Sequence, residues 1–514
     1  MSKLSYKLSS IAVLALMLSG CYSDLSTDAG IELPDIVVEG VEPEIKILFG
    51  ETLSLQADAY VEGTQDKPLT YLWEMDLTPG KESDRIVLGE EASVSYRIAC
   101  SPSDQPYALT LTVTDPESGL GKVVSSLVYV SSTLGEGLLV AHTRDGGAHS
   151  ELDLVSSKSI TYGSEAEEPV YTRDIYPLAN DGPLEGRVNA MTSALITNGA
   201  VYNEPLILIG TDEHFMALET TTFKKYREDM NLFGDFRGDT FKTTSVFTYS
   251  GIMCGAVVND VLYLNIGHTN NVFNKAAYTK VPANVFNSRN IGYNKPGGDI
   301  VFFNEEEGNF YFMHGMFSGY AAFAVVSENF GVNLAGSQAI AAGCGKTATS
   351  AFFLKAPDGD YYLFYMHPNE PLYSHYKVEG AGLDEAVSYA FCDNADIFYY
   401  ATPDKIYSVL MTGGTATVTA LSWTPDSPGE KITYIKQYMQ AWYGTHQYTL
   451  SSDSYPFVLD TNRLQIMITT YNETTGEGKI YLRPFNVSTG RFTFKDNGTF
   501  GGFGQITAIG TTFR

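Results

Sequence analysis

Aromatic and histidine side chains that could contact a ligand gather in one stretch near the C-terminal end of the chain. Trp442, Tyr443 and His446 stand within WYGTHQY, between two strand-like segments, ITYIKQYMQA and YPFVLD. Aromatic rings on an exposed loop can stack on sugar faces or hold a peptide at low entropic cost. We therefore expect these three residues to be candidate ligand-binding residues. The alternative is that Trp442 ends a strand and packs between neighbouring sheets.

A second candidate group lies about seventy residues earlier. His367 and His375 bracket the segment that contains Tyr373 in MHPNEPLYSHYK. Such a segment is either a solvated loop or a loop that faces a ligand, because binding residues are often carried by loops on a rigid scaffold. We name His367, Tyr373 and His375 as further candidates for ligand binding.

Motifs for catalysis, metal binding and nucleotide binding are missing from the sequence. Ala341–Thr347 ends like a phosphate-binding loop, but Ile340 occupies the position where that motif needs glycine, so we expect a strand and a turn there. The eight histidines include no HExxH, and neither a calcium loop nor a Gly-x-Ser-x-Gly elbow is present. We name no catalytic residue, no metal ligand and no cofactor.

The N-terminus has the pattern of an export signal that ends at a cysteine. Lys3 and Lys7 precede the apolar run IAVLALML, which is too short to span a bilayer. The run continues into Leu18-Ser19-Gly20-Cys21, which resembles a bacterial lipobox. We expect residues 1–20 to be a signal peptide, Cys21 to carry the lipid and residues 21–31 to be a tether. Because no later segment is long and apolar enough to span a bilayer, lipid is the only membrane anchor that we expect.

Composition predicts a large, well-packed and acidic protein. The 514 residues exceed the size at which single cores stop growing, so we expect at least two domains. The full chain has a net charge of −27, and loss of residues 1–20 leaves 31 basic and 60 acidic residues, a net charge of −29. Such a charge argues against a nucleic-acid partner and against adsorption to anionic membranes. Cys100, Cys254, Cys344 and Cys392 stand apart in apolar contexts, so we expect buried thiols, although export permits any of three disulfide pairings.

Residues 32–133 predict a small β-sandwich. Six strand-like segments recur about every ten residues, and apolar and hydroxyl residues alternate from Leu109 to Asp115. Tyr71 and Trp73, together with Tyr107–Asp115, resemble two characteristic strands of the PKD domain, an immunoglobulin-like sandwich. The Asp-Phe and Gly that usually follow the tryptophan are absent, so the segment is PKD-like. We expect Trp73 to lie in the core between two sheets.

Residues 134–514 predict a β-propeller. Pairs of apolar and aromatic segments flank short polar turns, as in GLLVAHTRDGGAHSELDLV and SAFFLKAPDGDYYLFYMH, and most of these hairpins recur every forty to seventy residues. That spacing is close to the period of propeller blades and favours seven or eight of them. Phe503–Gly510 is the expected strand that completes a blade with the N-terminal part. An irregular multi-sheet sandwich or a solenoid is the alternative.

Asp24 and Asp28, just after the cysteine, resemble the surface-export signal of Bacteroidetes lipoproteins. The chain as a whole, with a lipobox, a PKD-like sandwich and a hairpin-rich remainder in this order, resembles the PKD-like lipoproteins of Bacteroidetes. The resemblance implies an outer-membrane lipoprotein that faces the cell exterior. Its implied partners are a TonB-dependent transporter of the starch-utilisation type and the transporter's surface lipoprotein lid. It implies a ligand-binding or accessory role in nutrient uptake and supplies no catalytic residue.

Two further functions stay open. One is a glycoside hydrolase or lyase, because propeller glycosidases draw their paired carboxylates from distant blades, so spacing in the sequence cannot exclude such a pair. The other is a structural or adhesion lipoprotein. The sequence does not distinguish a glycan ligand from a peptide or a small cofactor.

Overall fold

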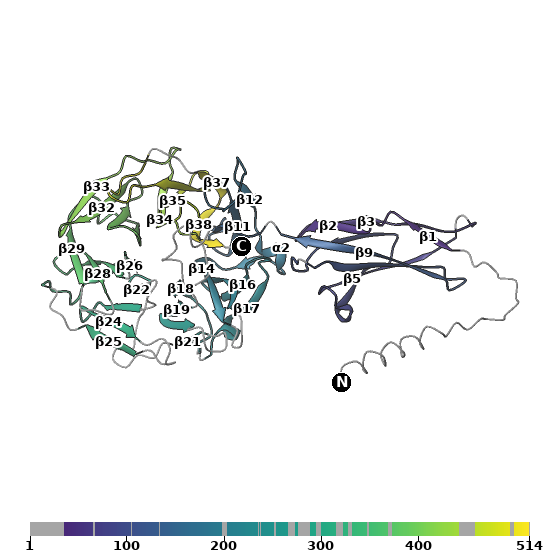
Figure 1. Ribbon diagram of the computed structural model, residues 1–514. Coiled ribbons are helices and arrows are strands. Elements are labelled where there is room, and N and C mark those ends of the chain that lie inside the picture. Colours follow the sequence, from purple (N-terminus) through teal and green to yellow (C-terminus); the bar gives the residue numbers. More distant parts are fainter. Residues whose placement is uncertain are drawn as a thin grey trace, which may run out of the picture. The chain divides into compact units, whose positions relative to one another are not determined.

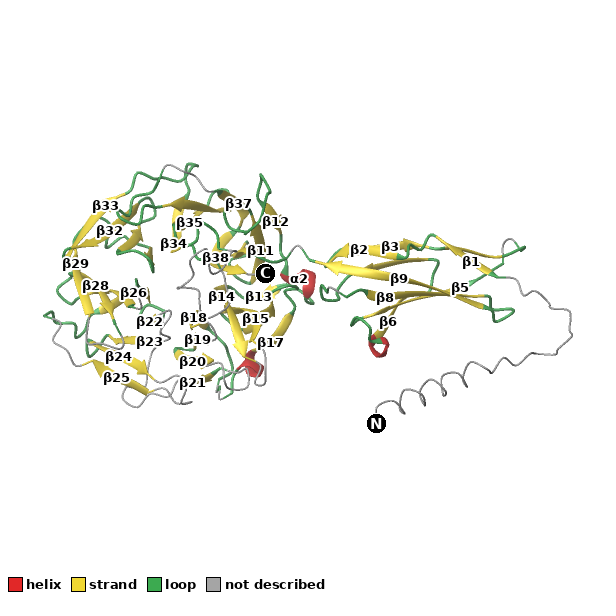
Figure 2. Cartoon of the chain, viewed as in Figure 1, coloured by secondary structure: helices red, strands yellow, loops and turns green. Residues whose placement is uncertain are grey.

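The protein is built almost entirely of β-strands (Figures 1 and 2), which confirms the predicted all-β class. The chain divides into two compact units: one comprises Met1–Ile45, Leu53–Tyr96 and Pro106–Val128, and the other comprises Lys46–Thr52, Arg97–Gln105 and Tyr129–Arg514. The expected domain bounds stay a prediction. None of the helices in the described part has the length and apolarity needed to cross a membrane. The computed structural model describes residues 35–512 except for residues 65–66, 104, 133, 198–202, 235, 237, 251–252, 266–272, 276–287, 294–299, 315–321, 327–330, 347–348, 368–372, 441–457 and 494–497.

The N-terminal strands form one five-stranded sheet and two short ladders. The sheet has the order β2 (Glu44–Leu48), β9 (Gly121–Ser131), β8 (Tyr107–Thr114), β5 (Thr70–Asp76) and β6 (Arg85–Gly89). The ladders pair β1 (Ile36–Glu39) with β4 (Asp58–Val61) and β3 (Thr52–Gln56) with β7 (Ser93–Arg97), and the short 3₁₀ helix η1 (Glu82–Asp84) precedes β6.

The core of this unit follows the alternation in the sequence. Tyr107, Leu109, Leu111 and Val113 of β8 are buried, and the residues between them are half-buried. Trp73 on β5 lies opposite Leu111 and is 0% exposed, which confirms its predicted core position. Its indole Nε1–H donates to a backbone carbonyl oxygen at 2.9 Å, so the polar end of the ring is also satisfied.

Seven sheets of strands succeed one another around a ring in the described part of the second unit (Figure 1). We call each of these sheets a blade, and six of the seven blades consist of four consecutive strands each. Blade 2 has β14 (Val188–Thr197), β15 (Asn203–Thr211), β16 (Phe215–Glu219) and β17 (Lys225–Glu228), with η2 (Asp229–Leu232) after it; blade 3 has β18 (Thr243–Ser250), β19 (Met253–Val258), β20 (Val261–Asn265) and β21 (Asn274–Lys275); blade 4 has β22 (Ile291–Tyr293), β23 (Ile300–Asn304), β24 (Asn309–His314) and β25 (Ala322–Val326). Blade 5 has β26 (Gln338–Cys344), β27 (Ser350–Lys355), β28 (Tyr361–Met366) and β29 (Tyr373–Val378); blade 6 has β30 (Ser388–Phe391), β31 (Ile397–Ala401), β32 (Ile406–Thr412) and β33 (Thr415–Ala420); blade 7 has β34 (Lys431–Gln437), β35 (Gln465–Asn472), β36 (Glu477–Pro484) and β37 (Thr499–Phe503).

Blade 1 joins the two ends of the propeller sequence. Its strands are β38 (Gln505–Thr512), β10 (Gly137–Thr143), β11 (His149–Ser156) and β12 (Val170–Thr172), and β13 (Leu184–Glu185) pairs with β11 after the short helix α2 (Tyr176–Ala179). The C-terminal β38 pairs antiparallel with β10 from Gly137↔Thr512 to Thr143↔Gln505. The predicted closing strand is therefore confirmed, and the ring has seven blades in the described part. Because the sheets form a closed ring, the alternative of an irregular multi-sheet sandwich or a solenoid is wrong.

Packing between blades explains the long apolar runs in the sequence. The middle strands of blade 5, β27 and β28, are buried on both faces, because each face of a blade packs against a neighbouring blade. One core cluster joins blades 4 and 5 through Phe310, Phe352 and Phe364. Another joins blades 5 and 6 through Phe353 and Phe398. Burial on both faces accounts for strands that read as continuous hydrophobic segments without alternation.

The four cysteines of the described residues are buried, and no disulfide joins them. Burial in an apolar environment raises the pKa of the Cys254 and Cys392 thiols. The prediction of buried thiols is thereby confirmed.

Candidate functional site

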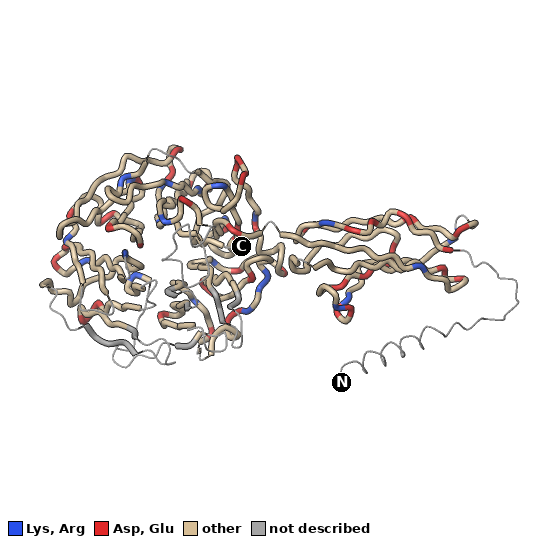
Figure 3. The backbone as a smooth tube through the Cα atoms, viewed as in Figure 1, with Lys and Arg blue, Asp and Glu red and all other residues tan. Residues whose placement is uncertain are grey.

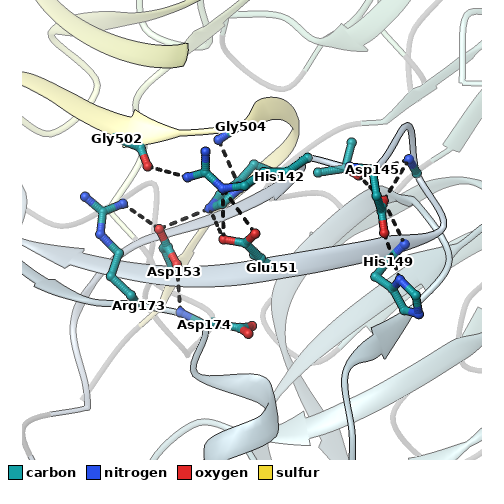
Figure 4. Close-up of polar contacts among 12 residues, drawn as sticks. His142, Asp145, His149, Glu151, Asp153, Arg173, Asp174, Gly502 and Gly504 are labelled. Carbon is teal, nitrogen blue, oxygen red and sulfur yellow. Dashed lines mark hydrogen bonds and ion pairs between the residues drawn. The ribbon is translucent and has the colours of Figure 1, made fainter. Parts of the chain in front are cut away.

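A group of charged side chains joined by hydrogen bonds lies where blade 1 closes the ring (Figure 4). Strand β10 contributes His142, β11 contributes Asp153, and Arg173 follows β12. These segments come from the beginning of the propeller, whereas Gly504 joins β37 to β38 at its end. We call His142, Asp153, Arg173 and Gly504 the closure cluster.

Both ring nitrogens of His142 have hydrogen-bond partners within the protein. The backbone N–H of Gly504 donates to Nδ1 at 3.1 Å, so Nδ1 is an acceptor and the proton of the neutral ring lies on Nε2. Nε2 in turn lies 3.1 Å from Oδ2 of Asp153. The side chain of His142 is 0% exposed. A histidine held in this way has no nitrogen left to take a proton from a substrate, so its role here is structural.

Asp153 is the centre of the closure cluster. Its side chain is buried, and it accepts hydrogen bonds from His142, from Arg173 Nη1 at 2.6 Å and from the backbone N–H of Asp174 at 2.8 Å. Burial by itself raises the pKa of the Asp153 carboxyl, but these hydrogen bonds outweigh burial and lower the pKa. Asp153 is therefore held as a carboxylate that joins β10, β11 and the residue after β12.

Glycine residues allow the closing segment to approach the cluster. Arg173 Nη2 donates to Gly501 O at 2.9 Å, and Arg144 Nη2 donates to Gly502 O at 2.7 Å. A Cβ atom on Gly504 would stand 2.3 Å from the backbone oxygen of Thr143, which no side chain tolerates. Gly504 thus permits the close approach to Thr143, and the two arginine contacts tie β37 of blade 7 to blade 1.

A polar pocket elsewhere on the propeller differs from the closure cluster, because its side chains can contact a ligand. It lies at one end of blades 5 and 6, has a volume of about 220 Å³, and we call it the blade 5–6 pocket. Blade 5 contributes the turn after β26, the end of β28 and the start of β29; blade 6 contributes the turn before β31 and the end of β32. Its lining residues are Lys346, Thr349, Tyr365, Ser374, Tyr376, Asp396 and Met411.

An ion pair bridges the two blades at this pocket. Lys346 Nζ lies 2.7 Å from Asp396 Oδ2, and both side chains are partly exposed. Tyr365 is 8% exposed, and its hydroxyl has no hydrogen-bond partner among the described residues. Burial, with Asp396 nearby, raises the pKa of the Tyr365 phenol well above its usual value, so this residue is neutral. The pocket therefore offers one cation, one anion and several neutral hydroxyl groups.

A second cavity lies in the centre of the ring and is smaller, about 100 Å³. The innermost strands line it, including Ser193, Thr248 and Thr511, and Phe247 and Tyr293 stack there with ring centroids 5.0 Å apart. Its volume leaves room for a few water molecules, since one water occupies about 30 Å³ of liquid. We regard the blade 5–6 pocket as the better candidate for a ligand-binding site, because its volume is larger and because both a cation and an anion line it.

The structure places only some of the ligand-binding residues predicted from sequence. Trp442, Tyr443 and His446 lie outside the described residues, as does Cys21. His367 directly follows β28 and is half-buried. Tyr373 and His375 lie on strand β29, which corrects the expectation that they stand in a loop.

Stacking explains the position of His375. Its ring stacks on Phe364 of the neighbouring strand, with centroids 5.3 Å apart and planes 15° apart, and it also stacks on Tyr373 at 5.9 Å. Tyr373 packs against the core between blades 4 and 5. These two residues point to the opposite face of blade 5 from Tyr365, because side chains alternate along a strand. Whether either residue contacts a ligand stays a prediction.

The pocket residues themselves were not identified from sequence. Lys346 belongs to the segment that resembles the end of a phosphate-binding loop, and this segment begins with the expected strand, β26. Asp396 is one of many acidic residues and carries no motif. Within the described part of the chain, no three His, Cys, Asp or Glu side chains are arranged to hold a metal ion.

Comparison with known proteins yields structural likeness alone. No family model matches the chain, and no curated protein matches it. The dihydro-heme d1 dehydrogenase NirN, solved in complex with DHE, aligns with 78% of this chain and 72% of its own at 11% identity and a TM-score of 0.38. AztD from Citrobacter koseri aligns with 86% of this chain and 98% of its own at 10% identity and a TM-score of 0.36.

The extracellular domain of BT4673 from B. thetaiotaomicron aligns with 90% of this chain and 68% of its own, at 10% identity and a TM-score of 0.33. Scores and identities this low carry no argument about function. The assignment as a propeller rests on the pairing of the strands, above all of β38 with β10.

Proposed function

We propose that this protein is a surface-exposed, lipid-anchored subunit that binds a ligand or assists a nutrient importer in the outer membrane. The observation that carries the proposal is the N-terminal sequence ending in Leu18-Ser19-Gly20-Cys21, because it resembles a signal peptide with a lipobox, the pattern that directs export and lipid attachment in bacteria. The implied partners are a TonB-dependent transporter and its surface lipoprotein lid, and the implied N-terminal domain is PKD-like.

The architecture is compatible with such a role. The seven blades of the described part hold loops from distant parts of the sequence at the two faces of one ring. Binding sites are commonly built from loops on such a rigid scaffold. In the closure cluster, both ring nitrogens of the one histidine, His142, have hydrogen-bond partners within the protein. These observations favour binding as the first function to test, with glycans and peptides as the candidate ligand classes.

The proposal is tested with the full-length protein, extracted from membranes in detergent. Co-isolation with an outer-membrane transporter and its lipoprotein lid is the expected result. The same sample is incubated with panels of polysaccharides and peptides, and both retention and turnover are measured. Retention without turnover supports a binding subunit. Turnover indicates a hydrolase or lyase, and failure of both assays together with no transporter partner would contradict the proposal.

Cys21→Ala is expected to abolish lipidation and release the protein from the membrane fraction. The thiol is the acceptor of the lipid, and no other anchor is expected. Mass spectrometry of the N-terminal peptide and sedimentation of membranes measure the two effects, with Cys100→Ala as the control that keeps the anchor. Protease added to intact cells should remove the native protein. Protection until the outer membrane is broken would contradict surface exposure but leave the lipid anchor standing.

Trp442→Ala is expected to weaken ligand binding by about 1–3 kcal/mol, by analogy with aromatic stacking platforms. The melting temperature should not change if Trp442 is a ligand-stacking residue on the surface. Calorimetric titration with a ligand retained in the panel assay measures the affinity, and thermal denaturation measures stability. A lower melting temperature with unchanged affinity would instead identify Trp442 as a packing residue.

A further inference from the structure

We propose that the blade 5–6 pocket binds one ring of a neutral saccharide, an inference that rests on the ligand-binding function proposed above. The pocket is formed by residues of both blades. Lys346 and Thr349 come from the turn after β26, Tyr365 from β28, and Asp396 from the turn before β31. The inference follows from charge balance, from the mixture of donors and acceptors, and from the size of the pocket.

Charge balance argues for a neutral ligand. Lys346 and Asp396 lie 2.7 Å apart and neutralise each other. A phosphate or carboxylate attracted by Lys346 meets the carboxylate of Asp396, and a cation attracted by Asp396 meets the ammonium of Lys346. Figure 3 shows that both basic and acidic residues occur around the ring. A neutral ligand avoids both repulsions.

The hydrogen-bonding groups suit a ligand whose own groups both donate and accept. The Lys346 ammonium donates, the Asp396 carboxylate accepts, and the hydroxyls of Ser374 and Tyr376 can do either. Thr349 Oγ1 already donates to Lys346 O at 2.7 Å and keeps its capacity to accept. Sugar hydroxyls both donate and accept, so a single sugar ring can pair with all of these groups.

Tyr365 forms part of the pocket wall. Its hydroxyl is buried and unpaired among the described residues, which is unfavourable for a polar atom. A ligand hydroxyl that reaches this wall would give the phenol a partner. The neighbouring ring of Tyr376 lies edge-on to Tyr365, with centroids 6.4 Å apart, and Met411 adds apolar surface. Aromatic and thioether groups suit the C–H face of a sugar ring.

Size and shape limit the ligand to about one ring. The volume of about 220 Å³ lies below the range of about 300–1,000 Å³ that is usual for drug-sized ligands. Beside the pocket residues Lys346 and Thr349, Gly345 N donates to Thr349 O at 2.9 Å. A Cβ atom on Gly345 would lie 2.5 Å from Thr349 Oγ1 and 2.7 Å from Tyr365 Cδ1. The absence of a side chain there lets the turn pack close to Tyr365.

The test uses the full-length protein in detergent and a panel of D-glucose, D-galactose, D-mannose, L-rhamnose and N-acetyl-D-glucosamine. Saturation-transfer NMR detects binding, and calorimetric titration measures affinity and stoichiometry. Asp396→Ala removes the acceptor and should weaken binding at least tenfold, since hydrogen bonds to charged groups are among the stronger ones. The ion pair is partly exposed, so the melting temperature should stay unchanged.

The matched control is Asp404→Ala. Asp404 forms a similar exposed ion pair with Lys431 at 2.6 Å, and neither residue lines the blade 5–6 pocket. This variant should bind the sugar as the native protein does. Tyr365→Phe is the second test: it removes only the hydroxyl and should weaken sugar binding about two- to tenfold without lowering stability. Tyr362→Phe, on the same strand but in the core between blades 4 and 5, is its control.

Each outcome decides the proposal. One-to-one binding of a neutral sugar, weakened by Asp396→Ala and not by Asp404→Ala, supports it. Binding of no sugar in the panel, or equal affinities in the two aspartate variants, overturns it. Tripeptides that bind this pocket in place of sugars overturn the ligand class. Sugar binding that ignores Asp396 leaves the proposed ligand-binding function intact, as does co-isolation with the transporter, so the two proposals fail separately.

Discussion

Asp153→Ala is expected to lower the free energy of unfolding of the propeller by about 3–5 kcal/mol, as is usual when one partner of a buried ion pair is removed. The substitution leaves the buried Nε2–H of His142 without its acceptor, and the Asp174 backbone N–H loses its partner as well. Arg173 also loses its 2.6 Å contact. Urea denaturation of the full-length protein, followed by tyrosine fluorescence and circular dichroism, measures the change.

Asp404→Ala is again the control, because the exposed Lys431–Asp404 pair should contribute less than about 1 kcal/mol. Equal effects of the two substitutions would contradict the structural role of the closure cluster. Asp153→Asn keeps the size of the side chain and separates loss of charge from loss of packing. We expect it to be intermediate, because the amide can still accept one hydrogen bond.

Acid should remove the stabilisation that Asp153 provides. The pKa of its carboxyl is lower in the folded protein than the ordinary value of 3.8, so the folded state favours the carboxylate. The contribution is complete above the unfolded value and is lost as the pH falls through the lower, folded value. The difference in unfolding free energy between the native protein and Asp153→Asn should therefore be constant near neutrality and shrink below about pH 3.8. A difference that grows on acidification would contradict this assignment.

Trp73→Ala is expected to destabilise the N-terminal unit by about 3–5 kcal/mol, the usual cost of truncating a large core aromatic residue. Trp73 is fully buried opposite Leu111, and the indole N–H donates to the backbone oxygen of Glu91 at 2.9 Å. Truncation both opens a cavity and leaves that oxygen without a donor. Scanning calorimetry of the full-length protein should show a lower transition temperature for this unit alone.

The transition of the propeller should stay where it is, because domains generally unfold as units. Val123→Ala is the control, since Val123 lies in β9 of the same sheet but is 58% exposed and should change stability by less than about 0.5 kcal/mol. If both transitions shift together in Trp73→Ala, the two units do not unfold independently. If neither shifts, Trp73 does not support the core.

Much of the fold is local enough to be predicted from the sequence. The alternation from Leu109 to Asp115 predicts a strand with one buried face, and β8 shows that pattern. The spacing of the hairpins predicts a propeller because each hairpin needs only a short turn between two apolar segments. The spacing by itself favours seven or eight blades, since the number depends on how far the ring curves before it closes. The pairing of β38 with β10 sets it at seven in the described part.

The residues of the candidate site could not be predicted from the sequence, because they come together only after the blades pack. Lys346 and Asp396 lie fifty positions apart, and neither stands in a motif for ligand binding. His142 and the Gly504 backbone are 362 positions apart and meet only because the ring closes. Patterns among residues that are neighbours in the sequence do not predict contacts between residues so far apart. The prediction that His375 stands in a loop was wrong because β29 pairs with the adjacent strand β28, on which the His375 ring stacks against Phe364.

The all-β class, the buried face of the strand that carries Trp73, the presence of a strand at Phe503–Gly510 and the expectation of a lipid at Cys21 follow from the sequence alone. Each of these depends on residues that are close together in the chain or on an alternation that any strand with one buried face must follow. The folded structure is needed to see that the charged residues of blade 1 bond to one another, and that Lys346, Asp396 and Tyr365 surround an open pocket. The reason is physical: a buried charge must find a partner within the protein, and which partner it finds depends on which strands the ring brings together.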